Sequence, residues 1–456
     1  MQKWTFWRFE DKIIAEMQKM KKNASFYITR FLLIAVIALL PVKTFSLEYI
    51  DVYSTLSDTF SGFTDKNAGS TSFPSLNIPA GGREESLGSA ITGLADDISF
   101  FDYNPAASCV LKNTELALFH NSWISDSNLE TVAGTWRLND LGLGAKLKCF
   151  YVPFTEYNDF GDRMTSNYYS ETTGVINASY NFFNGYYFKG LAVGANLKGS
   201  WRSIPDYTDR TTGELIKNSG LSQSGAAVMV DLGILLRFNA AKYFADRDPN
   251  LKIGISLLNA GVALTGFGSS QGIKIDDSLP TCISAGISYK FAKPVTICAD
   301  FRQPINLLDF SQSEMWSAGI GVDVQITDFM ELMAGFRLKG ANPRISLGTE
   351  IDLKHFILDL NYTFDLTSSI NPVNHFSVAA KINFGDHGRY INELKADDYY
   401  EEGLKYYASG QMEKAVESWE ECLKLNPSFT PARNSIELVR NSTKLFDRVM
   451  NIQTLE

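Results

Sequence analysis

The sequence predicts an all-β transmembrane barrel of about 14 antiparallel strands, followed by a small α-helical domain. Three observations lead to this fold class. Apolar and polar residues alternate with a period of two over most of the stretch from residue 115 to residue 384. The connections between the alternating segments are long and short by turns. After residue 395 the pattern changes to one that is typical of helices.

Residues 1–46 are expected to be a signal peptide. An uninterrupted apolar run, FLLIAVIALL at 31–40, follows a region that carries lysine and arginine and precedes the small-residue stretch TFS. Such a run is typical of a cleaved export signal, and it is too short to span a bilayer comfortably as a helix. We therefore expect cleavage near Ser46 and an exported mature protein.

The barrel, residues 115–384, is expected to consist of segments with one apolar face. In FILDLNYTF at 356–364, for example, apolar and aromatic side chains share one face, whereas Asp359 and Asn361 lie on the other. Segments of roughly 9–13 residues suit tilted strands that cross a membrane, and many of them begin or end in an aromatic residue. We expect strands at 115–124, 129–138, 141–153, 172–182, 188–201, 225–238, 251–262, 281–291, 294–302, 315–326, 329–338, 343–353, 354–364 and 374–384.

Loop lengths separate a membrane barrel from a soluble β-sandwich or propeller. The odd-numbered gaps include the long ones, at 154–171, 202–224, 263–280, 303–314 and 365–373. The even-numbered gaps are mostly tight, with 239–250 as the longer exception. Long loops outside and short turns in the periplasm are the outer-membrane pattern, for which a soluble sandwich has no reason. We therefore expect an outer-membrane protein, and the even strand number predicts that both termini are periplasmic.

The inward faces of the strands carry both charges and small residues. The charged positions mix both signs and are expected to pair across a narrow lumen; they are Asp231, Arg237, Lys290, Asp300, Asp323, Glu331, Arg337, Glu350, Asp359 and Lys381. Small inward positions leave a slot that another segment must fill; the glycines among them are Gly194, Gly233, Gly286, Gly321, Gly335 and Gly348. An open, water-filled porin usually needs about 16 or more strands.

The stretch LGSAITGLADDISFFDYNPAA at 87–107 stands just before the first strand. It resembles the N-terminal motif of the long-chain fatty-acid transporter (FadL-like) superfamily, including its PorV/PorQ branch. The matching residues are Gly88, Ala90, Leu94, Ala95, Asp96, Asp97, Ser99, Asn104, Pro105 and Ala106. With the strands, the resemblance covers residues 80–384. It implies a fourteen-stranded barrel with residues 47–114 as a hatch in the lumen, and passive uptake of hydrophobic molecules or lipids such as long-chain fatty acids.

The hatch contains the candidate ligand-binding residues. Asn104 as N-cap and Pro105 as first residue are expected to start a short helix in the lumen. Aromatic side chains are expected to line an apolar slot, and the two adjacent aspartates to pair with inward lysine or arginine. The full candidate set is Asp96, Asp97, Phe100, Phe101, Tyr103, Asn104 and Pro105. A hatch that only plugs the barrel and a hatch that contacts ligand both fit the sequence.

The C-terminal residues 396–427 resemble one tetratricopeptide (TPR) repeat. The matching positions are Tyr399, Gly403, Tyr406, Ala415, Trp419, Cys422 and Pro427. We expect a linker at 385–395 and a periplasmic repeat with a capping helix at 396–456. This tail departs from the fatty-acid transporters and indicates a spirochaete-type branch of the superfamily.

A single repeat rarely buries enough core to be stable alone. The repeat is therefore expected to pack on the barrel, to dimerise or to hold a periplasmic protein partner. The candidate partner-binding residues are Tyr399, Tyr406 and Trp419. A PorV-like scaffold for exported proteins, with this repeat as its docking site, is the alternative to the uptake channel.

Neither an enzyme nor a cofactor or metal protein is predicted. His375 and Ser377 have the spacing of a lipid-cleaving dyad, but their place in the alternation points them into the lumen and away from the bilayer. The Asp96–Asp97 pair lacks further ligands at calcium-loop spacing. Five scattered cysteines favour neither a disulfide framework nor a metal site. A net charge of −9 gives no footprint for nucleic acid.

Overall fold

The computed structural model describes residues 49–124, 126–185, 188–209, 211–244, 248–265, 278–367 and 374–453. The expected signal peptide at 1–46 lies outside these ranges. The chain forms two compact units, Met1–Thr55 and Leu56–Glu456, and helix α2 (Tyr49–Phe60) contains the boundary between them. The barrel and the C-terminal helices belong to the second unit.

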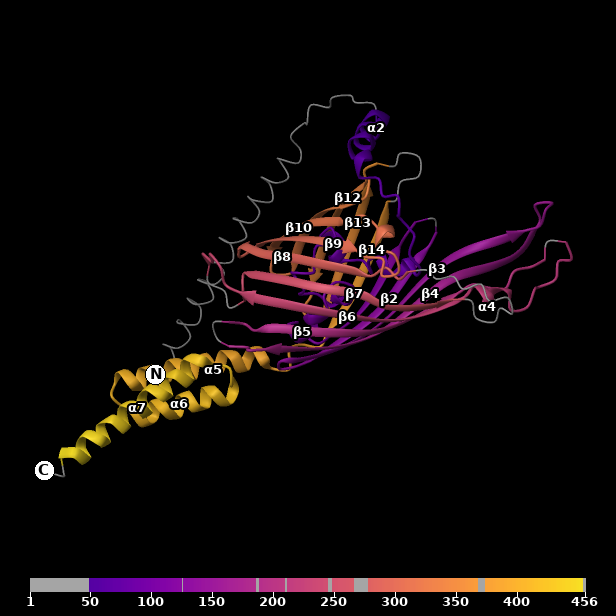
Figure 1. Cartoon of the computed structure of the whole chain (residues 1–456). Helices are drawn as coiled ribbons and strands as arrows, with labels where there is room; N and C mark the ends of the chain where they lie inside the picture. Colours follow the sequence, from indigo (N-terminus) through magenta and orange to yellow (C-terminus); the bar gives the residue numbers. More distant parts are fainter. Residues whose placement is uncertain are drawn as a thin grey trace, which may run out of the picture. The chain divides into compact units, whose positions relative to one another are not determined.

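A closed barrel of antiparallel strands forms the body of the second unit (Figure 1). Each strand pairs with its neighbours in sequence, and β1 pairs with β14 to close the ring. The predicted number of strands is confirmed, and each expected segment overlaps with one strand. The strands are β1 (Glu115–Ser122), β2 (Asn128–Leu138), β3 (Leu141–Tyr157), β4 (Arg163–Phe182), β5 (Leu191–Ser203), β6 (Gly225–Phe238), β7 (Leu251–Thr265), β8 (Cys282–Ala292), β9 (Val295–Pro304), β10 (Ser317–Thr327), β11 (Met330–Lys339), β12 (Asn342–Asp352), β13 (Phe356–Asp365) and β14 (His375–Asn383).

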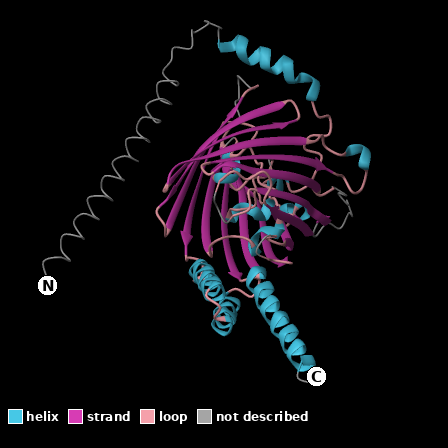
Figure 2. Ribbon diagram, turned by 90° about the vertical axis from the view of Figure 1, so that its left-hand side faces the viewer, coloured by secondary structure: helices cyan, strands magenta, loops and turns pink. Residues whose placement is uncertain are grey.

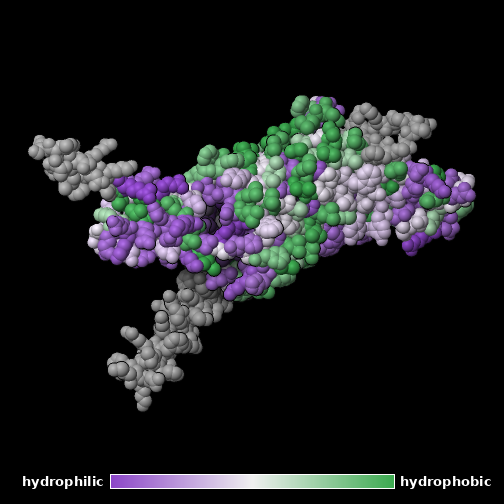
Figure 3. All heavy atoms as spheres, turned by 90° about the horizontal axis from the view of Figure 1, so that it is seen from below, coloured by the Kyte–Doolittle hydropathy of each residue, from purple (hydrophilic) through white to green (hydrophobic). Residues whose placement is uncertain are grey.

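The strands expose apolar side chains outward and bury polar ones inward. On β4, Ile176 is 67% exposed, whereas its neighbour Asn177 is buried. Figure 3 shows the resulting hydrophobic band over the barrel, with hydrophilic surface on either side of it. An outward apolar band with a polar interior is the arrangement that a barrel needs in a lipid bilayer, because every backbone group is paired within the closed sheet. No helix among the described residues is both long and apolar enough to span a membrane.

The two ends of the barrel differ in their connections. At one end, called here the long-loop end, lie the β5–β6 connection with helix α4 (Ser219–Gln223) and the β9–β10 connection with η5 (Phe310–Gln312). The other end, the short-turn end, carries the connections that follow the even-numbered strands, such as the two-residue turns after β2 and β8. The predicted parity is found with exceptions, because the β6–β7 connection at the short-turn end spans residues 239–250 and the β11–β12 connection at the long-loop end spans only residues 340–341.

The prediction of one long loop, at residues 154–171, is wrong. Residues 154–171 are mostly strand, because β3 continues to Tyr157 and β4 begins at Arg163, with ladder pairs such as Phe154 with Asn167. Both faces of this hairpin are partly exposed to solvent. The one-sided apolar pattern is therefore lost there although the strands continue.

Three helices follow the barrel, α5 (Arg389–Ala408), α6 (Met412–Leu425) and α7 (Thr430–Gln453). Only residues 384–388 separate β14 from α5, so the linker is shorter than the expected 385–395. The helices share an apolar core in which Trp419 is buried and donates a hydrogen bond from Nε1 to the Tyr400 carbonyl oxygen at 3.2 Å. Gly403 faces the Trp419 ring and has no room for a side chain. The helices thus occupy the region for which the repeat is predicted, and the repeat itself stays a prediction.

Candidate functional site

The segment of residues 71–111, called here the luminal segment, lies inside the closed barrel (Figure 2). Nearly all of its residues are buried. It is in contact with the long-loop end where Thr71 forms a β-bridge with Ser278. At the short-turn end, Arg137 Nη1 donates a hydrogen bond to the Leu111 carbonyl oxygen at 2.8 Å. The luminal segment therefore passes through the whole barrel, from the long-loop end to the short-turn end.

The residues just before the luminal segment are attached to the β9–β10 connection. The Met315 amide donates to Asp65 Oδ2 at 2.8 Å, and Asn67 Nδ2 donates to the Ser313 carbonyl oxygen at 3.0 Å. The chain thus enters the lumen at the long-loop end. Helix α5, which follows β14, begins at the short-turn end. The first residues of the chain lie outside the described ranges, so the predicted side of the two termini stays a prediction. Strand parity determines where β1 begins and β14 ends, but not how the preceding segment threads through the lumen.

Inward glycines make room for the luminal segment, as the sequence predicts. A methyl group on any of the six would come closer than 3.0 Å to an atom of the luminal segment; they are Gly194, Gly233, Gly286, Gly321, Gly335 and Gly348. The backbone of the luminal segment can therefore lie directly against the barrel wall. A close approach of two backbones is the structural role for which glycine is needed in a strand.

Two short 3₁₀ helices organise the centre of the luminal segment. Asp97 caps η3 (Ile98–Asp102) and accepts a hydrogen bond from the Ser99 amide at 2.9 Å. Asn104 caps η4 (Pro105–Cys109), where its Oδ1 accepts from the Ala106 amide at 3.1 Å. The predicted cap at Asn104, with proline in the first position, is confirmed.

The aromatic candidates are packed and do not line an open slot. The rings of Phe100 and Phe101 stack with centroids 4.3 Å apart, and both side chains are fully buried. Tyr103 is buried too, and the Arg302 guanidinium lies over its ring, 4.2 Å from the centroid. In this conformation these side chains hold the luminal segment against the wall.

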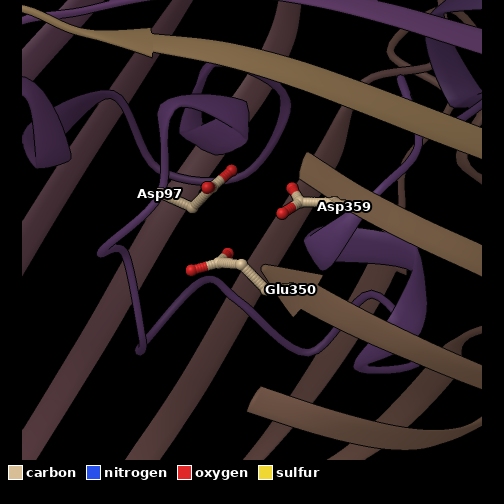
Figure 4. Close-up of side chains that lie close together, drawn as sticks. All are labelled: Asp97, Glu350 and Asp359. Atoms are coloured by element: carbon tan, nitrogen blue, oxygen red, sulfur yellow. The ribbon is translucent and has the colours of Figure 1, made fainter. Parts of the chain in front are cut away.

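Lys381 on β14 binds three carboxylates at once. It pairs with Asp97, and its Nζ lies 2.7 Å from Asp359 Oδ2 and 3.4 Å from Glu350 Oε2. Oxygens of these three carboxylates lie within 4.8 Å of one another, and Figure 4 shows the side chains turned toward a common point. Three such carboxylates have the chemistry to hold a metal ion, but here the buried ammonium of Lys381 compensates their charge.

Arg83 forms a second ion network, which was not predicted from the sequence. It begins helix α3 (Arg83–Ser86) of the luminal segment and contacts Asp323 at 2.6 Å, Glu331 at 2.7 Å and Asp96 at 3.7 Å. Asp96 also lies 3.6 Å from Lys252. Both adjacent aspartates therefore pair with lysine or arginine, as expected. Arg83 itself lies outside any periodic pattern, and its positive charge within the predicted hatch was its only signal.

His375 and Ser377 point into the lumen, as the sequence predicts. His375 Nε2 and Ser377 Oγ both bind the carboxylate of Glu85, the serine at 2.8 Å. The His375 ring also packs on Trp123 with centroids 4.3 Å apart. The two side chains do not form a dyad with each other. Instead they attach helix α3 to the barrel wall.

Two cavities flank the luminal segment. A small one of about 40 Å³ at the long-loop end is lined by Arg302 and Arg337 among others, and has room for a few water molecules. A wide chamber of about 1900 Å³ opens at the short-turn end. Its lining mixes basic and acidic residues from the strands, the luminal segment, the turns and the C-terminal helices. Those on strands include Arg137, Arg237, Lys252, Lys290, Asp323, Glu331 and Glu350.

The chain is similar to several solved outer-membrane proteins. The Pseudomonas putida toluene transporter TodX aligns with 67% of this chain and 98% of its own, at 14% identity and a TM-score of 0.44. A Pseudomonas aeruginosa FadL homologue aligns over the same shares, at 11% identity and a TM-score of 0.38.

Sequence relatives are found in Treponema pallidum (strain Nichols). One UPF0164 protein is 30% identical over 398 residues, which cover 85% of this chain and 87% of the relative. A second is 26% identical over 400 residues, with 82% and 76% covered. Residues 50–387 match the Uncharacterised protein family (UPF0164). The chain therefore belongs to the UPF0164 family.

Proposed function

We propose that the protein is an outer-membrane channel for the passive uptake of hydrophobic molecules such as long-chain fatty acids. One observation carries the proposal: a barrel with an apolar exterior holds its own N-terminal segment in the lumen from end to end. General porins have more strands and a water-filled lumen. A filled lumen instead suits a selective passage that opens when the internal segment moves.

The sidedness of the barrel follows from its loops. Outer-membrane barrels have long loops outside and short turns in the periplasm. The short-turn end and α5–α7 are then periplasmic, and the luminal segment runs from the cell surface to the periplasm. The luminal segment serves as the hatch between the small cavity at the long-loop end and the wide chamber at the short-turn end.

The resemblance of residues 87–107 to the FadL-like motif supports a hydrophobic cargo. In the closed state Phe100 and Phe101 are buried against the barrel wall, and the small pocket is too small for an acyl chain. Movement of the hatch would uncover apolar surface at these aromatics, next to the capped turn at Asn104 and Pro105. The ion pairs of Asp96 and Asp97 would hold the hatch closed until then. No catalytic role is proposed.

Uptake of labelled fatty acid into proteoliposomes tests this function. In a Cys109→Ala background, Ser108→Cys and Ser179→Cys place thiols where the two hydroxyl oxygens lie 2.6 Å apart. A disulfide between them would join the hatch to β4. Wild type should take up the fatty acid, and the oxidised variant should take up much less and recover on reduction. Absence of uptake by wild type would contradict the function, and unchanged uptake by the oxidised variant would contradict the hatch.

The alternative is a PorV-like scaffold that receives exported proteins. Its support is the helical domain, where Tyr399 and Tyr406 retain exposed surface while Trp419 is buried as packing. A photo-crosslinking residue at Tyr399 should then trap one defined periplasmic protein, and the same residue at Phe160, an exposed position at the long-loop end, should not. If neither position traps a protein, the scaffold is not supported.

A further inference from the structure

Three arginines lie at the short-turn end of the barrel and line one chamber. Arg137 on β2, Arg237 on β6 and Arg389 on α5 all line the wide chamber. Their guanidinium groups are held by backbone carbonyl oxygens: Arg137 donates to Leu111 at 2.8 Å, Arg237 to Lys189 at 2.6 Å and Arg389 to Arg137 at 3.2 Å. These bonds orient the three cations without neutralising them.

The positive charge of this arginine cluster is not compensated by an ion pair. Within the described ranges, none of the three has a carboxylate oxygen within 4.0 Å, whereas the buried Lys198 lies 2.7 Å from Asp231. Arg137 repels both Arg237 and Arg389. Burial, together with the positive charge of Arg137, lowers the pKa of Arg389 to about 10.

One of the three arginines also has an unused hydrogen-bond donor. Arg237 Nε is buried and has no hydrogen-bond partner among the residues that the structure describes. Carboxylates act on the three arginines only from beyond ion-pair distance: Asp140 and Glu393 on Arg137, Asp248 and Asp140 on Arg237, and Asp386 and Glu393 on Arg389. Asp140 Oδ1 also accepts a hydrogen bond from Asn184 at 2.8 Å. A buried donor beside repelling cations is costly unless an anion binds there.

We propose that Arg137, Arg237 and Arg389 form an oxyanion-binding site that takes a carboxylate or phosphate group. Guanidinium groups match such oxyanions because they offer several N–H donors in one plane. Tyr390 and Ile391, which follow Arg389, line the same chamber and are 60% and 55% exposed. They supply apolar surface beside the cations, so the site suits the head group of an amphiphile. Only the identification of that amphiphile as transported cargo rests on the proposed uptake function.

Calorimetric titration of the full-length protein in neutral detergent tests the site. The probes are sodium sulfate, a free oxyanion; decanoate, an amphiphile with a carboxylate; and decanol, its neutral counterpart. Decanoate should bind wild type more tightly than decanol does. Arg237→Gln should weaken decanoate binding about tenfold or more, because a hydrogen bond to a charged group is lost, and should leave decanol binding unchanged.

Two further variants separate binding from folding. Arg389 lies on α5 and outside the strands, so the barrel can close without its side chain. The variant Arg389→Gln should also weaken anion binding. Arg163→Gln replaces an exposed arginine at the long-loop end and should bind as wild type does.

If sulfate binds and its binding depends on Arg237, the site takes free oxyanions as well as head groups. If decanoate binds and sulfate does not, the site is specific for the head groups of amphiphiles. Either outcome supports the proposed site. If wild type binds neither anion, or if both glutamine variants bind like wild type, the proposal is overturned. Anion binding without fatty-acid uptake would refute the uptake function and leave the site standing.

Discussion

Replacement of Lys381 by methionine should release the luminal segment from the barrel wall. Lys381 is 1% exposed and compensates Asp97, Glu350 and Asp359. Without the ammonium, the three carboxylates remain within 4.8 Å of one another. Two unit charges at that separation repel by about 3.5 kcal/mol at an effective dielectric constant of 20. Breaking a buried ion pair by removing one partner costs about 3–5 kcal/mol, and we expect a loss of stability of that size.

Thermal unfolding of the purified barrel and its conductance in planar bilayers measure the effect. The variant should unfold at lower temperature and show more frequent channel openings. The difference from wild type should shrink as the pH falls, because protonation of the carboxylates removes their repulsion. Adding Asp359→Asn should restore part of the lost stability, since it removes one of the repelling charges.

Lys424→Met is the matched control. Lys424 also pairs with a carboxylate, that of Glu421, but both side chains are exposed on α6. Exposed pairs of this kind contribute at most about 1 kcal/mol, so stability and conductance should be nearly unchanged. The reasoning is refuted if Lys381→Met is as stable and as closed as wild type, or no worse than the control.

Three more outcomes are expected. Gly194→Ala should destabilise the barrel by about 1–3 kcal/mol in thermal unfolding, because its new methyl group meets the luminal segment; Gly199→Ala on the same strand, with open space around it, should be neutral, and equal effects would contradict the packing. With Gly62→Cys and Glu413→Cys, an impermeant maleimide added to intact cells should label only the first; labelling of both or of the second alone would contradict the threading. Burial raises the pKa of Cys422 to about 11, so iodoacetamide at pH 8 should alkylate it only after the helices unfold, and fast alkylation of the folded protein would count against this packing.

The strands were predictable because the two faces of each strand lie in different surroundings. One face meets lipid and the other meets the polar lumen, so residue type alternates along the chain wherever the strand crosses the bilayer. Where β3 and β4 continue beyond the apolar band, both faces meet water, and the pattern ends before the strands do. The glycine positions such as Gly194 and Gly335 were predictable in the same way, as a slot that needs a filling segment.

The partners of the luminal segment were not predictable. Arg83 carries an ion network although it stands in a stretch without periodicity, and Lys381 finds Asp97 across 284 residues of sequence. The meeting of Arg137, Arg237 and Arg389 likewise depends on which strands become neighbours at the short-turn end.

The sequence by itself determined the barrel, its strand number, the polar lumen and the capped turn at Asn104. Each of these is set by the local environment of one face or one turn, which residue type reports directly. Only the tertiary structure decided the direction in which the luminal segment threads the barrel, the packed state of Phe100 and Phe101, and the pairing of each buried charge. Those features depend on distances between residues far apart in the chain, which exist only once the barrel has closed.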